Sequence, residues 1–257
     1  MNQQVPGAPP ERQGLPRLVW GIFRHPVATL SYVRDHPQRL WLVPAIILGT
    51  LIVVNASVAF PISTRLAQEA MQEQLAQMPP EAQAQVQQFT QPGGAFTTIG
   101  WVGGIIAGLV GLAVSWLFRA GVLHFVSLAL GGQSRFAEMF SVANWARMPT
   151  AIRGVLQAVY VPLMGKLITP GLAGLLAEPE SPLRQGTSVA YALLSRIDLW
   201  TIWELILLGL GVSVVARFSR RKAAGIVLGY WLLTLALALI PVLIGRAFLP
   251  LVPTPAP

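Results

Sequence analysis

The sequence contains an uncharged apolar stretch of 21 residues, LWLVPAIILGTLIVVNASVAF, at Leu40–Phe60. About 20 apolar helical residues are enough to cross the hydrocarbon core of a bilayer, which is roughly 30 Å thick. Hydrophobic residues make up 54% of the 257 residues and charged residues only 11%, whereas a soluble domain carries about 25% charged residues. The composition therefore predicts an integral membrane protein, and it excludes a disordered chain, which would combine low hydrophobicity with high charge.

Four further apolar runs follow, and together with the first they predict an all-α fold with five transmembrane helices. The second and fifth runs carry no charge, the fourth contains one acid, Glu204, and the third is interrupted by Arg153 and Lys166. The end of the third run could lie as far along the chain as Leu176. The predicted spans are residues 40–60, 98–118, 149–168, 199–216 and 223–245.

Basic residues predict the orientation, because the cytoplasmic flanks of membrane spans collect Lys and Arg. Five arginines precede the first span, four lie around the junction of the second and third, and four basic residues separate the fourth from the fifth. Thirteen of the 18 basic residues thus fall on alternate segments, which predicts a cytoplasmic N-terminus and an outside C-terminus. The middle group is Arg119, Arg135, Arg147 and Arg153, and the last group is Arg217, Arg220, Arg221 and Lys222.

The segment before the first span predicts two short helices. Leu15, Leu18 and Ile22 recur at helical spacing opposite Arg17 and Arg24, which is typical of an interfacial amphipathic helix. The first helix either lies on the inner leaflet or packs under the bundle, and we favour the leaflet because inner leaflets are anionic. The predicted units are a disordered tail at 1–14, cytosolic amphipathic helices at 15–36, a membrane domain at 37–250 and a second tail at 251–257.

Residues 61–97 have a different composition and form the predicted outer loop. The segment is rich in Gln and Ala, and Pro79-Pro80 interrupts it. We expect two short helices with a bend at the prolines. The loop is either a solvated spacer or a docking surface for an extracytoplasmic partner. No apolar signal-peptide core precedes the first span, so that span is expected to act as an uncleaved anchor.

Motifs that would carry catalysis are missing from the sequence. The chain has no cysteine, and its three histidines lack the H-E-x-x-H spacing of a zinc site. No G-x-S-x-G nucleophile motif, P-loop or G-x-G-x-x-G motif is present. We therefore predict no enzymatic activity, no cofactor, no metal and no nucleic-acid partner. The net charge of +8 indicates orientation and a surface that contacts anionic inner-leaflet lipids.

Glu204 is the most unusual residue of the spans, because an ionisable group inside a membrane is costly and suggests a function. Asn55 and Glu204 each lie five residues from the expected outer end of their spans, so they should share one depth. We expect these two residues to belong to a polar cluster inside the membrane. That cluster either binds an ion, a proton or a lipid head group, or it is a structural hydrogen bond or ion pair that holds the bundle together. Its predicted members are Asn55, Lys166, Asp198, Glu204 and Arg246.

Glycines at four-residue spacing predict close helix packing, since small residues let helix backbones approach each other in lipid. The packing is either within one chain or across a homodimer or a membrane-protein partner. The glycines concerned are Gly100, Gly104 and Gly108 in the second span and Gly225 and Gly229 in the fifth.

Several motifs in order resemble the Yip (Ypt-interacting-protein) membrane domain family in its bacterial form. Ile22–Pro26 (IFRHP) is similar to the family's entry helix, Gly131-Gly132 before Pro149 to its central segment, and Asp198–Trp203 (DLWTIW) to the start of its fourth span. Ser219–Ala223 (SRRKA) resembles the basic turn before its last span, and the Gln-rich outer loop is also typical. The resemblance covers roughly residues 15–246.

The resemblance implies a five-helix membrane domain with a cytosolic N-terminus. Eukaryotic members are trafficking factors that bind Rab-type GTPases, but their Asp-Leu-Tyr-Gly-Pro motif is absent from this sequence. We therefore expect a non-enzymatic protein of the inner membrane with a membrane-organising, trafficking-like or adaptor role. The alternative is a small transporter or channel-like subunit that uses the polar site around Asn55 and Glu204.

Overall fold

The computed structural model describes residues 14–76, 95–176 and 188–248, and the predicted tails and the Pro79-Pro80 bend lie outside them. The described residues form helices joined by short turns, which confirms the all-α fold. The short helices are α1 (Leu15–Arg24), α2 (Pro26–Asp35), α3 (Pro37–Leu40), α7 (Phe136–Trp145), the 3-10 helix η1 (Gly171–Leu175) and α10 (Val189–Leu194). The long ones are α4 (Leu42–Ala76), α6 (Ala95–Ala129), α8 (Met148–Met164), α11 (Leu199–Ala216) and α12 (Arg220–Phe248).

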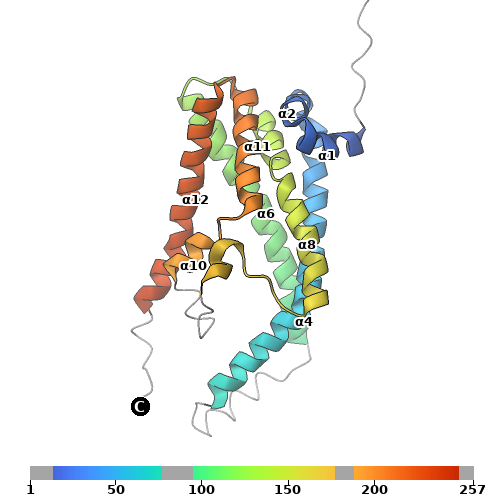
Figure 1. Cartoon of the computed structure of the whole chain (residues 1–257), viewed down its shortest axis with the longest axis vertical. Coiled ribbons are helices and arrows are strands. Elements are labelled where there is room, and N and C mark those ends of the chain that lie inside the picture. The colour runs from blue at the N-terminus through green and yellow to red at the C-terminus, as the bar shows by residue number, and fades with distance from the viewer. Residues whose placement is uncertain (1–13, 77–94, 177–187, 249–257) are drawn as a thin grey trace, which may run out of the picture.

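The long helices lie side by side along the long axis of the molecule, and α1 and α2 lie across one end (Figure 1). Within the described residues, α4, α6, α11 and α12 are long and apolar enough to cross a membrane. The predicted fourth span coincides with α11, and the fifth lies within α12. Helix α8, which occupies the predicted third span, is 17 residues long.

Helix α4 continues through Pro61 to Ala76, so the predicted outer loop does not begin at residue 61. A proline removes one backbone donor from a helix and tends to kink it, but it does not always end one. Helix α6 is also continuous to Ala129, eleven residues beyond the predicted end of its span. Both helices are 35 residues long, and each therefore extends about 50 Å, well beyond a bilayer core of roughly 30 Å.

The two N-terminal helices pack against the bundle, which corrects the preference for a helix lying on the leaflet. Leu18 and Ile22 of α1 and Leu30 of α2 are completely buried. Helix α2 contacts α7 and α11, and the Arg34 Nη1 donates a 3.3 Å hydrogen bond to the Val214 carbonyl. An apolar helix face is equally suited to lipid and to protein, so the amphipathic pattern alone did not distinguish them. Trp20 on the opposite side of α1 stays 58% exposed.

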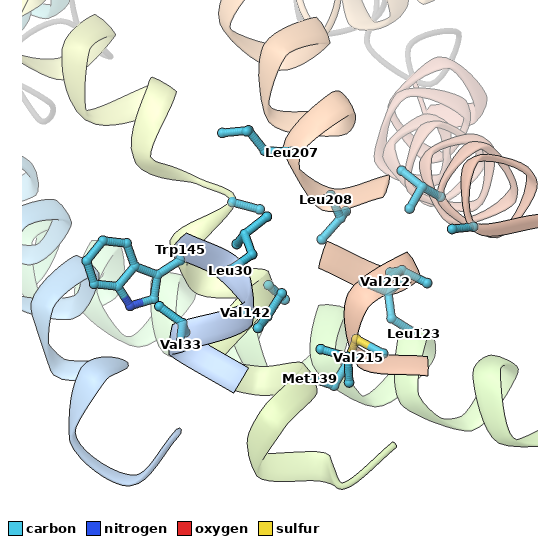
Figure 2. Close-up of a cluster of buried hydrophobic side chains, with 14 of the residues drawn as sticks. Leu30, Val33, Leu123, Met139, Val142, Trp145, Leu207, Leu208, Val212 and Val215 are labelled. Carbon is cyan, nitrogen blue, oxygen red and sulfur yellow. The ribbon is translucent and has the colours of Figure 1, made fainter. Parts of the chain in front are cut away.

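Apolar side chains fill the end of the bundle beneath α1 and α2, and we call this region the dry end. Figure 2 shows Leu30 of α2, Val142 and Trp145 of α7 and Leu208 of α11 meeting there. Trp145 is completely buried, and its indole N–H donates a 2.8 Å hydrogen bond to the Leu40 carbonyl. A buried tryptophan needs such a partner, so this bond fixes α7 against α3, just before the first long helix.

The segment before α11 folds back on itself through backbone contacts. Gly171 begins η1 at φ 57°, a left-handed conformation that glycine adopts without steric cost. A Cβ at this position would lie 2.6–2.8 Å from the carbonyl oxygens of Leu194, Ser195 and Ile197. The next amide, of Leu172, donates a 3.0 Å hydrogen bond to the Ile197 carbonyl. These contacts hold η1 against the turn that connects α10 to α11.

Candidate functional site

A cavity of about 500 Å³ lies between α6, α8, α11 and α12, and residues of the η1–α10 segment also line it. Four arginines and one acid line this cavity, and so many charged side chains are unusual inside a membrane domain. We call it the arginine cavity. Its charged lining residues are Arg119, Arg147, Arg153, Arg196 and Glu204.

Glu204 occupies the second turn of α11, where Asp198 caps the helix by accepting a 2.6 Å hydrogen bond from the Thr201 amide. The Glu204 side chain is buried and forms an ion pair with Arg119 of α6. Its carboxylate also lies 3.7 Å from the Nε atom of Arg147, which precedes α8. One carboxylate thus faces two guanidinium groups from different helices.

The two guanidinium groups next to Glu204 are held by neutral groups as well. The Nε–H of Arg119 donates a 3.3 Å hydrogen bond to the Tyr230 hydroxyl of α12. The Nη1 of Arg147 donates a 3.0 Å hydrogen bond to the Ser115 hydroxyl, one turn before Arg119 on α6. These bonds bring α6, α8, α11 and α12 together around a single charged centre.

Two donors of this centre are buried without a hydrogen-bond acceptor in the part of the chain that the structure describes. They are the Nη1 of Arg119 and the Nε of Arg147. Arg119 is only 8% exposed, so water does not readily replace the missing acceptor. A buried donor without a partner costs about 1–3 kcal/mol, and more when the group is charged. The centre therefore carries an excess of positively charged donors.

The predicted polar cluster divides into separate parts in the structure. Asp198 pairs with Arg153 of α8 at 2.8 Å, beside the arginine cavity. The amide of Asn55 donates to the carbonyls of Leu51 and Gly154 at 2.8 Å and 3.0 Å, so it joins α4 to α8. Asn55 lines a second, smaller cavity of about 250 Å³, which also borders Arg147 and Arg153.

Lys166 and Arg246 are exposed residues away from this centre. Lys166 follows the end of α8, and Arg246 lies in the last turn of α12. Neither residue lines the arginine cavity. The charged partners of Glu204 are therefore arginines that the sequence analysis had placed elsewhere.

Arg119, Arg147 and Arg153 were counted as cytoplasmic flanking charges, but the structure places them around the cavity. The cause is the length of α6, which continues for ten residues beyond Arg119, or about 15 Å. A usable signal was present in the sequence. Ser115 and Arg119 are four residues apart inside one apolar run, so they share a helix face, and an inward arginine needs an acid such as Glu204.

The glycines predicted to support packing have different surroundings. A Cβ on Gly108 would meet the Ile52 side chain at 3.1 Å, which shows a close approach of α6 to α4. A Cβ on Gly100, Gly104, Gly225 or Gly229 would find no described atom within 4 Å. Contact with a second chain at these four positions stays a prediction.

The predicted cytosolic basic face lies at the dry end. Arg217, Arg220, Arg221 and Lys222 are exposed around the turn between α11 and α12. Lys222 donates a 2.7 Å hydrogen bond to the Leu130 carbonyl at the end of α6 and lies 4.1 Å from the centre of the Phe218 ring. Within the described residues, no group of three His, Cys, Asp or Glu side chains is placed to hold a metal ion.

Comparison with known proteins places this architecture in a family. A family model of the Yip1 domain matches residues 20–243. No curated protein and no solved structure matches the chain. The family match begins inside α1 and ends inside α12, so it includes both the dry end and the arginine cavity. The resemblance drawn from the motifs is confirmed, and the chain belongs to the Yip1 domain family.

Proposed function

We propose that this Yip1-domain protein is a five-span protein of the inner membrane that organises membranes or recruits partners, without enzymatic activity. Its N-terminus would lie in the cytoplasm and its C-terminus outside. The observation that supports this proposal is the docking of α1 and α2 onto the basic end of a bundle whose long helices expose many apolar side chains (Figure 1).

Helix α8 supports the count of five spans. It lies along α4 and is about 26 Å long, close to the thickness of the bilayer core. Its outward residues are apolar, and Val155, Leu156, Val159 and Leu163 are each more than half exposed. A row of exposed apolar side chains beside other membrane-spanning helices is stable when it faces lipid. With α8 crossing, the five long helices alternate in direction.

The dry end combines exposed basic residues with an exposed aromatic one. Arg24 lies 5.0 Å from the centre of the Trp20 ring on α1, and Trp20 points away from the bundle. Anionic inner-leaflet lipids attract such a surface by about 1 kcal/mol for each basic residue near the membrane. This surface is where we expect the chain to contact the leaflet and a membrane-protein partner.

The absence of cysteine from the chain allows a direct test of the topology, since single cysteines can be introduced at will. Ser219→Cys lies in the turn between α11 and α12, and Lys166→Cys follows α8. In intact cells, a membrane-impermeant maleimide should label Lys166→Cys and leave Ser219→Cys unlabelled. Labelling of both variants, or of neither, before the cells are opened would contradict five spans.

The adaptor role is tested by purifying the tagged full-length protein in mild detergent and identifying what remains bound. Trp20→Ser alters the outward face of α1. Leu163→Ser, an exposed change on α8, is the matched control. A partner lost only with Trp20→Ser would support the proposal, whereas recovery of the bare monomer would contradict it.

A further inference from the structure

The arginine cavity has an uncompensated positive charge. Four arginines line it, and the acids next to them are Glu204 in its wall and Asp198 at its edge. Ionisable side chains inside a membrane domain usually pair with one another, because a lone charge is costly there. Arg153 is paired with Asp198, and Arg196 is exposed. The incomplete pairing therefore concerns Arg119 and Arg147, which share Glu204. A bound anion would balance these two.

Donors without an acceptor point to the same conclusion. The Nη1 of Arg119 and the Nε of Arg147 are buried and have no acceptor among the described residues. Both guanidinium groups contact the cavity. Glu204 cannot satisfy them all, because its carboxylate is already paired with Arg119 and lies 3.7 Å from the Arg147 Nε. An oxygen-rich anion in the cavity would accept from both.

The size and the lining favour a phosphoryl group. A cavity of about 500 Å³ falls within the range of roughly 300–1,000 Å³ typical of small-ligand sites. Arginine binds phosphate oxygens through two parallel hydrogen bonds, and its donors suit a tetrahedral oxyanion. Hydroxyl groups of Thr150, Ser195 and Thr201 also line the cavity.

The cavity is open to the outside of the bundle. Phe118, at its margin on α6, is 41% exposed, and Arg196 at the turn before α11 is exposed as well. Apolar walls from Leu205 and Trp231 adjoin the charged lining. Such a mixture suits a ligand with a charged head and an apolar body.

We propose that the arginine cavity binds a phosphoryl group, supplied either by the head group of an anionic lipid or by a free phosphate. Arg119 and Arg147 bind its oxygens, and Arg196 lies at the entrance. Glu204 keeps the guanidinium groups of Arg119 and Arg147 in position. The inference needs only that α6, α11 and α12 lie in the membrane, and it goes beyond the proposed adaptor role.

The test uses the full-length protein in a neutral detergent, with binding followed by tryptophan fluorescence because Trp231 lines the cavity. The probes are inorganic phosphate, dihexanoyl phosphatidylglycerol and, as a phosphate-free control, dihexanoylglycerol. Sodium chloride keeps the ionic strength constant. The variant is Arg147→Gln, and Arg221→Gln, an exposed residue of the basic turn, removes the same charge outside the cavity.

We expect Arg147→Gln to weaken phosphoryl binding at least tenfold and Arg221→Gln to leave it unchanged. If Arg147→Gln does not fold, Arg196→Gln replaces it, because Arg196 is exposed. Binding of the lipid but not of inorganic phosphate identifies a head-group site, and binding of phosphate alone identifies a soluble anion. Equal binding of dihexanoylglycerol, equal loss in both variants or no binding of either phosphate probe would overturn the proposal. The adaptor role is tested separately by the proteins that co-purify with the chain, so either proposal can fail without the other.

Discussion

The two halves of α11 lie in opposite environments. Its C-terminal half enters the dry end, where Leu208 and Val212 are completely buried among apolar side chains (Figure 2). Its N-terminal half carries Glu204 into the arginine cavity. Glu204 and Leu208 are four residues apart, so they share one face of the helix and are separated by only about 6 Å along its axis.

The two regions differ in what they contribute to the bundle. The dry end contains well-packed apolar side chains, and its buried groups without a hydrogen-bond partner among the described residues, which include Ser141 and Asn144 of α7, are neutral. The unsatisfied donors of the arginine cavity are charged. Apolar packing stabilises a fold, whereas a buried donor left unsatisfied destabilises it, and most of all when the donor is charged. The second region is therefore the better candidate for a function, and variants in each region should behave differently.

The largest expected effect is that of Glu204→Gln, which leaves the buried Arg119 without its carboxylate. Breaking a buried ion pair by removing one partner costs about 3–5 kcal/mol. We expect a strong loss of monodisperse protein in detergent size-exclusion chromatography. Glu69→Gln, which breaks an exposed pair with Arg65, is the control and should change little. Wild-type yield for Glu204→Gln would mean that the charge of Glu204 is unnecessary for the fold.

Leu18→Ala should loosen α1 from the dry end. The side chain is completely buried, and truncating a buried leucine costs about 2–5 kcal/mol. Because α1 is a single short helix, we expect local release, seen as faster tryptic cleavage after Arg24. Leu15→Ala is the matched control, since Leu15 is 53% exposed. Equal cleavage rates in the two variants would show that α1 is held by lipid rather than by the bundle.

Gly211→Ala should destabilise the contact between α11 and α7. The added Cβ would lie 2.5 Å from Cγ1 of Val142, and such overpacking costs about 1–3 kcal/mol. Gly225→Ala, where a Cβ meets no described atom within 4 Å, should be neutral or stabilising. Thermal unfolding in detergent compares the two. Destabilisation or a changed oligomeric state with Gly225→Ala would instead indicate a second chain against α12.

The smallest effect concerns Asp35, at the end of α2. A hydrogen bond from Arg34 lowers the pKa of the Asp35 carboxyl below its ordinary value of 3.8. The charged form thus stabilises the folded state above pH 3.8, and this contribution disappears as the pH falls through the lowered pKa. The pair is largely exposed, so Asp35→Asn should lower the free energy of unfolding by well under about 1 kcal/mol at neutral pH. A difference from wild type that persists after the pH has fallen well below the lowered pKa would show that charge is not its cause.

The four helices in the described part of the chain that are long and apolar enough to cross a membrane were largely predictable, because long apolar runs leave few alternatives. Residues 199–216 match α11, and Asp198 caps it through the Thr201 amide. The end of α4 was not predictable from hydropathy, since the helix continues past Pro61 into polar sequence. Helix α6 continues past Arg119 through a largely apolar stretch to Ala129. The docking of α1 was missed because an apolar stripe does not reveal whether lipid or protein covers it.

The candidate site was predictable only in part. Glu204 stood out as an acid in an apolar run, but its partners did not, because a basic residue near a span end has two explanations. It can lie in the cytoplasm, as Arg221 is proposed to do, or turn inward, as Arg119 does. Only the arrangement of the four helices distinguishes the two, and that arrangement depends on contacts between residues far apart in the sequence.

The backbone contacts around Gly171 have a consequence for how this site can evolve. Three carbonyl oxygens surround the glycine and leave no room for a Cβ, and the Leu172 amide donates to one of them. The lining residues Pro170, Ser195 and Arg196 border this junction. Substitutions of the neighbouring side chains could therefore change which ligand enters, while the backbone around Gly171 keeps its position. We expect sequence comparison among relatives to find variable positions around a nearly unchanging Gly171.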